Sequence, residues 1–281
     1  MLMLFSAIAC SVAVSVLLKL ARSHNLQIAQ SILVNYAVAS ALTLLLLKPN
    51  LAVLAEPSIH WLLLISLGIL LPSVFLIMAK AVAHAGIALS DAAQRLSLFI
   101  PLLMAFLIFA EPLNMSKFAG IALALAALMG LIYRPTKSAR KNTKQAAWVL
   151  IGVWLGYGVI DVTFKQLAKT GAAFSASLLA SFVLSGCLLL LWLLVRKTKW
   201  HPASLAAGII LGLLNFGNIY AYIRAHQTFP ENPTLVFTAM NIGVICMGAL
   251  IGVALFKEKL HRVNVLGIAL AVAAIVLLIP Y

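Results

Sequence analysis

The sequence predicts an all-α integral membrane protein with ten transmembrane helices, arranged as two inverted repeats of five helices each. Hydrophobic residues make up 64% of the 281 positions and charged residues only 9%, whereas soluble domains carry about 25% charged residues. Apolar stretches of about 18 residues or more recur along the chain, and each is long enough to cross a hydrocarbon core of about 30 Å. Segments of the second half also repeat segments of the first half in the same order.

The apolar stretches follow one another with short connections, so neighbours in sequence are expected to pack antiparallel. The ten expected spans are 2–20, 27–47, 60–80, 89–110, 115–133, 146–165, 174–195, 203–223, 234–256 and 262–280. One polar and basic stretch, "RPTKSARKNTK" at 134–144, interrupts this series. It predicts a basic linker over 134–145 that separates a first repeat, 1–133, from a second repeat, 146–281.

Three matches between the halves indicate an internal duplication. "FAEPLNMSKFAGIALA" from Phe109 matches "FKEKLHRVNVLGIALA" from Phe256, which places Glu111 on Glu258 at an offset of 147 positions. The first span matches the sixth at an offset of 146, with Lys19 on Lys165, and the third matches the eighth at 144. Because five spans is an odd number, the second copy enters the membrane upside down. Many secondary transporters share this inverted-topology architecture.

These segments resemble the drug/metabolite transporter superfamily, and within it the ten-helix proteins with two EamA-type repeats. The resemblance covers nearly the whole chain and rests on "AEPLNMSKFAGIALALAA", "KEKLHRVNVLGIALAVAA" and Pro101. It implies a transporter rather than an enzyme, but no single substrate, because such proteins move amino acids, sugars, nucleobases, sugar phosphates and drugs. Small multidrug relatives use a buried Glu in the first helix to bind cations and protons. The first span here offers Cys10 and serines instead, which argues against proton-coupled export of lipophilic cations.

Matched helix breaks predict the position of a substrate cavity. Bilayer-spanning helices must satisfy their own backbone, so a break is tolerated only beside protein or a cavity. Pro72 in the third span corresponds to the "NFGN" segment around Gly217 in the eighth, and Pro101 in the fourth corresponds to Gly248 in the ninth. The cavity is therefore expected between these four spans, with the first and sixth spans completing its wall.

Polar side chains share faces of these spans, and such faces do not belong in lipid. The candidate substrate-binding residues are Gln94, Arg95, Trp154, Tyr157, Asp161, Asn215, Asn218, Tyr222, Thr238 and Asn241. A charge at mid-span costs roughly 2.5–3.5 kcal/mol on insertion scales. Arg95 and Asp161 are therefore expected to point inward toward partners. Asp91 and Asp161 are the candidates for coupling to protons.

Purely structural roles explain several of the same residues. Asp91–Arg95 and Asp161–Lys165 are i, i+4 pairs that can simply neutralise each other. Asparagines in membrane helices often bond only to neighbouring helices. The Glu-containing turns suit a helix cap and a charged stop at the membrane boundary. The glycine pairs of GxxxG type are more typical of packing seams than of ligand sites, and these are Gly152/Gly156, Gly208/Gly212 and Gly248/Gly252.

The net charge of +14 is carried by short loops between spans, where Lys and Arg meet anionic headgroups. The expected partners are therefore membrane lipids and a small-molecule substrate, not nucleic acid. The three cysteines are far apart and no histidine motif has metal-ligand spacing, so neither a metal nor another cofactor is expected. The six acidic residues are spread along the chain without a clustered pair or a nucleophile–base arrangement, which argues against an enzyme.

Charge asymmetry between the loops predicts the orientation in the inner (plasma) membrane. The side that holds the 134–144 loop collects most of the Lys and Arg residues, so the positive-inside rule places it in the cytoplasm and both termini outside. The resembled proteins usually have both termini inside. The expected function is secondary transport of a small polar organic metabolite, such as an amino-acid-like zwitterion. A lipid-handling or scramblase-type protein and an exporter of drugs, nucleobases or sugars are the alternatives.

Overall fold

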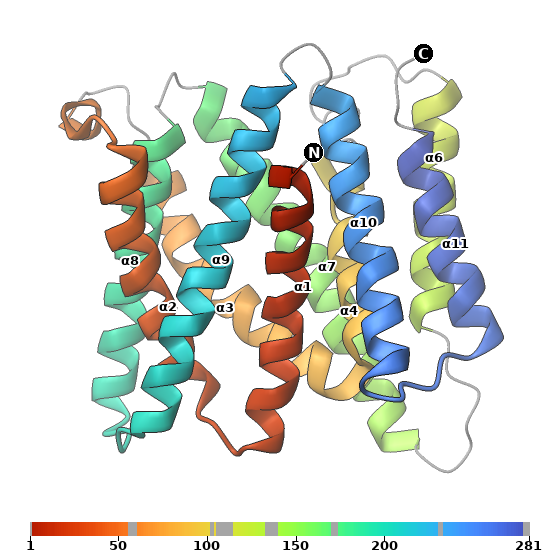
Figure 1. Ribbon diagram of the computed structural model, residues 1–281, viewed down its shortest axis with the longest axis horizontal. Helices are drawn as coiled ribbons and strands as arrows, with labels where there is room; N and C mark the ends of the chain where they lie inside the picture. Colours follow the sequence, from red (N-terminus) through yellow and green to blue (C-terminus); the bar gives the residue numbers. More distant parts are fainter. Residues whose placement is uncertain are drawn as a thin grey trace. The chain divides into compact units, whose positions relative to one another are not determined.

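A computed structural model of the chain describes residues 2–55, 61–101, 104, 115–132, 140–169, 174–229 and 233–277. Within these ranges all regular structure is helical, and α-helix occurs in each expected span (Figure 1). The α-helices are α1 (Leu2–Ser23), α2 (Ile28–Leu42), α3 (Trp61–Ala85), α4 (Ile87–Leu96), α6 (Met115–Ile132), α7 (Arg140–Lys169), α8 (Phe174–Val195), α9 (Pro202–Thr228), α10 (Pro233–Ala254) and α11 (Arg262–Val276). A π-helix at Thr43–Leu47 extends α2, and a short 3₁₀ helix follows at Leu51–Ala55.

The length and composition of these helices indicate a membrane-spanning protein and confirm the all-α class. Among the described residues, six helical segments are long and apolar enough to cross a bilayer, namely 2–23, 28–47, 61–85, 144–164, 174–195 and 202–228. Shorter apolar helices lie at 118–131, 239–254 and 262–276. Large apolar side chains such as Leu62 and Val195 are more than 70% exposed, as expected for surfaces that face lipid rather than water.

The chain forms two compact units, and each unit takes its segments from both halves of the sequence. Unit 1 comprises Met1–Lys19, Ile77–Gly158 and Gly217–Tyr281, and unit 2 comprises Leu20–Leu76 and Val159–Phe216. The helices α1, α3, α7 and α9 each continue from one unit into the other. The expected sequence repeats therefore do not coincide with the compact units.

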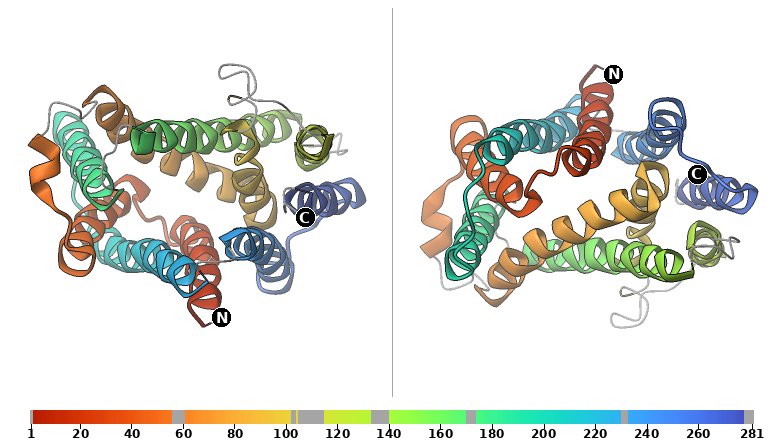
Figure 2. Two further views of the ribbon diagram at one scale, coloured as in Figure 1. Left: turned by 90° about the horizontal axis from the view of Figure 1, so that it is seen from above. Right: turned by 90° about the horizontal axis from the view of Figure 1, so that it is seen from below.

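Glycines set the spacing between α9 and α2 in unit 2. On another side α2 packs along α8 (Figure 2). A Cβ added at Gly208 would lie 2.6 Å from Val34 Cβ, and one added at Gly212 would lie 2.6 Å from Val38 Cβ. These separations exclude any side chain at either glycine, so the backbones of α9 and α2 approach closely. The Gly208/Gly212 pair is thus a packing seam, as the sequence indicated.

A buried polar cluster joins the start of α2 to the start of α9 in unit 2. Ser204 Oγ accepts a hydrogen bond from the Gln27 backbone N–H at 2.9 Å, and Ser31 Oγ donates to the Ser204 carbonyl at 2.8 Å. The fully buried Gln30 donates to the Lys199 carbonyl at 2.7 Å and accepts from the His201 N–H at 2.9 Å. The N–H of the N-cap residue Gln27 therefore finds a partner outside its own helix.

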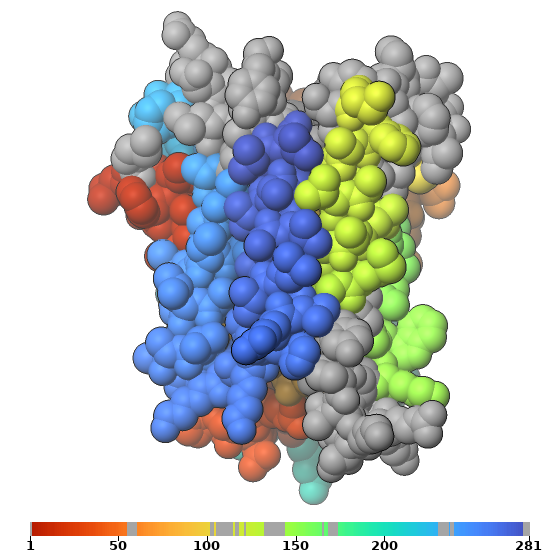
Figure 3. Space-filling model, turned by 90° about the vertical axis from the view of Figure 1, so that its right-hand side faces the viewer, coloured from red at the N-terminus to blue at the C-terminus, as the bar shows by residue number. Residues whose placement is uncertain are grey.

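In unit 1, α6 and α11 lie side by side and antiparallel (Figures 1 and 3). A Cβ added at Gly267 would lie 3.0 Å from the Ala127 carbonyl oxygen and 3.0 Å from the Leu131 nitrogen. Asn264 Nδ2 donates to the carbonyls of Gly130 at 2.9 Å and Leu131 at 3.3 Å, which satisfies the last turn of α6. The helix pair therefore depends on close backbone contact and on one capping amide.

An apolar core in unit 1 joins α1 to α9 and α10. Its buried residues are Leu4, Ala7, Ile8, Val12, Ala221, Ala225, Val236, Met240 and Val244. The same unit also packs α10 along α4. These contacts fix α1, α4 and α10 as the helices around the polar residues described below.

Three of the four expected helix breaks are absent. α3 runs through Pro72, α9 through Gly217 and α10 through Gly248 as continuous helix. A single proline removes one hydrogen bond and often bends a helix without ending it, and a glycine keeps its N–H, so it only weakens the helix.

An interruption does occur one turn before Pro101. α4 ends at Leu96 and a turn follows at Ser97–Leu98. Pro101 has no N–H to offer the Ser97 carbonyl, which instead accepts a hydrogen bond from Ile100 at 2.9 Å. Because no interruption occurs at Gly248, the matched pairs of breaks expected from the sequence do not form.

The basic segment between the repeats is shorter than expected. α7 begins at Arg140, inside the predicted linker 134–145. Arg, Lys and Gln are good helix formers, so the basic residues from Arg140 onward form the first turns of α7 instead of a linker. Residues 133–139 and Glu111 lie outside the described part of the chain.

Replacing Gly267 with Ala is expected to destabilise the protein by about 1–3 kcal/mol, because the new methyl group forces α6 and α11 apart. Thermal unfolding of the detergent-solubilised protein measures the change. The matched control is Gly186→Ala, where the added Cβ would lie 3.6 Å from Tyr36 Cβ, an ordinary contact distance. Equal midpoints for the two variants would contradict the proposed seam.

Candidate functional site

A line of polar contacts runs between α1 and α4 within unit 1, and we call it the polar ladder. Its members are Ser11, Ser15 and Lys19 of α1, Asp91 and Arg95 of α4, and Glu258 of the turn after α10. The α1 members are spaced four residues apart, which places them on one face of that helix. Asp91 and Arg95 have the same spacing on α4, so the two antiparallel faces meet turn by turn.

Asp91 forms the middle of the ladder and is almost fully buried, with 1% of its surface exposed. Its Oδ1 accepts a hydrogen bond of 2.6 Å from Ser15 Oγ. Its Oδ2 is buried and has no hydrogen-bond partner among the described residues. A Cβ added at Gly248 of α10 would lie 2.6 Å from this oxygen, so Gly248 allows the α10 backbone to cover the carboxylate. A buried carboxylate oxygen without a donor is costly and therefore marks a site that needs an explanation.

Arg95 lies one turn further along α4, and its Nη2 donates a hydrogen bond of 2.7 Å to Ser11 Oγ. Its guanidinium also attracts the Asp91 carboxylate electrostatically. The i, i+4 pairing that the sequence offered as a structural alternative is therefore present as an electrostatic interaction. Each member of the pair is in addition bonded to a serine of α1, so the pair is part of a contact between helices.

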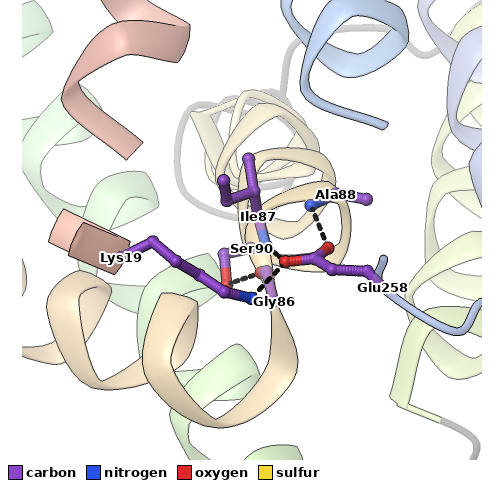
Figure 4. Close-up of polar contacts among 6 residues, drawn as sticks. All are labelled: Lys19, Gly86, Ile87, Ala88, Ser90 and Glu258. Carbon is purple, nitrogen blue, oxygen red and sulfur yellow. Dashed lines mark hydrogen bonds and ion pairs between the residues drawn. The ribbon is translucent and has the colours of Figure 1, made fainter. Parts of the chain in front are cut away.

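The other end of the ladder is a contact that we call the Glu258 clasp, formed by Glu258, Lys19 and the backbone N–H groups of Ile87 and Ala88 (Figure 4). Lys19 Nζ lies 2.5 Å from Glu258 Oε1. The N–H of Ile87 donates to Oε1 at 2.8 Å and that of Ala88 to Oε2 at 3.4 Å. Glu258 thus caps the N-terminus of α4 and places a negative charge at the positive end of the helix dipole.

Local backbone geometry brings Glu258 to this position. Lys257 has a φ of 50°, which turns the chain back after α10, and the Glu258 N–H donates to the Gly252 carbonyl at 3.0 Å. Gly86 has a φ of 95°, a conformation that favours glycine. A Cβ added at Gly86 or at Gly252 would lie 2.6 Å from the Glu258 carboxylate. The carboxylate therefore occupies space that two glycines leave open.

A cavity of about 420 Å³ borders the clasp at the end of unit 1 where α4 begins. Its lining residues are Lys19, Ala83, His84, Ala85, Gly86, Leu89, Glu258, Lys259, Leu260, His261 and Asn264. The lining thus combines ionisable side chains with the start of α4. Leu89, with 3% of its surface exposed, forms part of the wall.

Several predicted site residues tie other helices of unit 1 to α1 and α4. Trp154 Nε1 of α7 donates to the Leu96 carbonyl at 3.1 Å. Asn218 Nδ2 of α9 donates to the Ala7 carbonyl at 2.8 Å, one turn before Ser11 on α1. Asn241 is buried on α10, with 6% of its surface exposed.

The remaining predicted residues do not join the ladder through the described contacts. Asn215 belongs to unit 2, where its Nδ2 donates to Asn35 Oδ1 at 3.1 Å, as expected for an asparagine that only bonds to a neighbouring helix. Asp161 also belongs to unit 2 and is exposed. Gln94 and Tyr157 are half-buried, and the Tyr222 ring packs edge-on against His226 with centroids 4.7 Å apart. The side chains of Thr238 and Lys165 lie outside the described part of the chain.

Comparison with known proteins shows a relative in sequence and a shared fold. No protein-family model matches this chain. The sequence is 50% identical over 277 residues to an uncharacterized protein of Haemophilus influenzae. The match covers 97% of this chain and 95% of that protein. The chain belongs to the same family as that protein. A crystal structure of a protein 16% identical in sequence aligns over 98% of this chain and 94% of the other with a TM-score of 0.59, which shows a shared fold.

Reasoning from sequence did not assign Ser11, Ser15, Lys19 and Glu258 to the site. In the sequence, the serines of the first span stand out only because that span lacks an acid, and Glu258 suits a cap and a charged stop. Glu258 is indeed a cap, but of a helix that begins 171 positions earlier in the chain. The available signal was the four-residue spacing of Ser11, Ser15 and Lys19, which puts three polar groups on one face of an otherwise apolar helix.

Replacing Ser15 with Ala is expected to lower the free energy of unfolding by about 1–3 kcal/mol, because the buried Asp91 carboxylate loses a hydrogen-bond donor. Asp91→Asn removes one partner of the Asp91–Arg95 pair and leaves the Arg95 charge uncompensated, so it is expected to be at least as destabilising as Ser15→Ala. Ser6→Ala, on an exposed position of α1, serves as the control. Thermal unfolding in detergent ranks the variants, and a Ser15→Ala midpoint equal to that of Ser6→Ala would contradict the ladder.

Proposed function

We propose that the protein is a secondary transporter that moves a small polar organic metabolite, such as an amino-acid-like zwitterion, across the inner membrane by alternating access. The observation that carries the proposal is the polar ladder, in which a carboxylate and a guanidinium lie among apolar helices. Ionisable residues within membrane helices are costly, and they commonly mark substrate or proton pathways.

The chemistry of the ladder favours a zwitterion. Asp91 and Arg95 present opposite charges one helical turn apart, which complements a ligand with an ammonium group and a carboxylate group. Asp91 Oδ2, without a hydrogen-bond partner among the described residues, offers an acceptor for a substrate ammonium or for a proton. Coupling of transport to protons through Asp91 is therefore part of the proposal, whereas the exposed Asp161 has lower priority.

Packing between the two sequence halves supports the proposed inverted repeat. Three helix pairs, α2 with α8, α4 with α10 and α6 with α11, each join a helix of the first repeat to its counterpart in the second. Gly212 packs against Val38 and Gly68 packs against Leu184. Gly68 and Gly212 are 144 positions apart, which is the offset between the third and eighth spans. Val38 and Leu184 are 146 positions apart. Reciprocal contacts of this kind are what two copies related by an approximate two-fold axis produce.

Membership of the drug/metabolite transporter superfamily, with two EamA-type repeats and ten spans, is a further part of the proposal. It is supported by the repeated segments that lead from Glu111 and Glu258 into Gly-Ile-Ala-Leu-Ala. For the orientation we propose that the end of unit 1 with Lys19 and Glu258 faces the cytoplasm. Lys19 near the end of α1 and Lys257 and Lys259 after α10 are on the side to which the sequence assigns most basic residues, in keeping with the positive-inside rule.

Proteoliposomes containing the purified protein are expected to take up or release amino acids, and a pH gradient is expected to change the rate. Asp91→Asn is expected to lower the flux at least about tenfold and to abolish the dependence on the gradient, since an amide has no carboxylate charge to titrate. Asp161→Asn is the matched control and is expected to retain most of the flux.

The same vesicles distinguish the alternatives. Flux of drugs, nucleobases or sugars in place of amino acids would identify another substrate class. Movement of fluorescent lipids without solute flux would favour a scramblase. A protein that is folded by thermal unfolding but moves no solute and no lipid would contradict the proposed function.

A further inference from the structure

The Glu258 clasp joins three segments of unit 1 that are far apart in sequence. These are the end of α1, the start of α4, and the turn between α10 and α11. The contacts from the Glu258 side chain go to an ammonium group and to two backbone N–H groups, so each is charge-assisted. Lys19 is held additionally over the Phe256 ring, with Nζ 5.4 Å from the ring centroid.

The carboxylate is enclosed rather than solvated. The Glu258 side chain is 9% exposed, and it is seated against Gly86 and Gly252, where an added Cβ would occupy the same space. An exposed surface ion pair contributes little to stability, and it does not need two glycines to make room for it. The fit therefore indicates a specific contact that the fold is shaped to receive.

The clasp lies beside the 420 Å³ cavity, which Lys19, Gly86, Leu89 and Glu258 all line. Ile87 and Asp91 are one turn apart on α4, so the capped end of the helix leads directly to the buried carboxylate. Release of Glu258 would leave the first N–H groups of α4 and the Lys19 ammonium without this partner. It would also remove one wall of the cavity, which Glu258 lines.

We propose that the Glu258 clasp is a gate that closes this end of unit 1, and that the gate opens when Glu258 leaves Lys19 and the N-terminus of α4. The proposal rests on the proposed function, because a transporter that works by alternating access needs a closure that forms and breaks. Charge-assisted hydrogen bonds suit this task, since water or a charged ligand can replace them. The turn at Lys257 directs the short segment that carries Glu258 away from the axis of α10, so this segment is not part of the helix.

The test measures access to Leu89, which lines the cavity and is buried in the closed form. In a background with Cys10, Cys187 and Cys246 replaced by Ser, Leu89→Cys is labelled with a membrane-impermeant maleimide in open membrane fragments. Glu258→Gln is expected to speed labelling about tenfold, which corresponds to about 1.4 kcal/mol. Lys257→Gln, beside the clasp but not part of it, is expected to leave the rate unchanged. His261→Cys, at an exposed position of the rim, reports any general change in reactivity.

Exchanging the two charges tests whether closure needs the cap on α4 as well as the Lys19–Glu258 ion pair. Lys19→Glu combined with Glu258→Lys restores opposite charges but places an ammonium at the positive end of the α4 dipole, so labelling is expected to stay fast. Lys19→Gln keeps the helix cap and is expected to give a smaller increase, and it tests the gate if Glu258→Gln does not fold. Native labelling rates in both Glu258→Gln and Lys19→Gln, or restoration of the native rate by the exchange, would overturn the proposal. Labelling needs no substrate, so its outcome is separate from that of the transport assay.

Discussion

The burial of the Asp91 carboxylate among apolar helices is the constraint on which the architecture of unit 1 depends. A charge in such surroundings is tolerated only with compensating donors and nearby opposite charge. Ser15 supplies a hydrogen bond, Arg95 supplies the opposite charge, and Gly248 allows the α10 backbone to come against the remaining oxygen. The arrangement of α1, α4 and α10 follows from these requirements.

α4 differs from its neighbours because it is short and polar. Its ten residues include Asp91, Gln94 and Arg95, and it is held at its start by the Glu258 clasp and along its length by serines of α1. The turn at Ser97–Leu98, which Pro101 favours by withholding a donor, separates this polar helix from the residues that follow. These polar contacts add to apolar packing, because Ile87, Leu89 and Leu96 of the same helix are buried and α10 packs along it.

Glycine serves two different purposes in this protein. Gly68, Gly208 and Gly212 in unit 2 and Gly267 in unit 1 bring helix backbones together, which is how helices associate where water supplies no hydrophobic driving force. Gly86 and Gly252 of unit 1 instead leave space for a carboxylate. GxxxG spacing alone does not distinguish these uses, because the spacing gives no information about which group from another segment fills the space.

The sequence by itself determined the helical class, the approximate bounds of the helices and the presence of Asp91 and Arg95 at a polar position. Hydropathy, span length and four-residue spacing are local properties, so they can be read along the chain. Only the tertiary structure decided that Glu258 caps α4, that Asn215 bonds to Asn35, and that α3 continues through Pro72. These outcomes depend on which segments meet in space, and helix periodicity fixes the face that a residue occupies but not the partner that the face will contact.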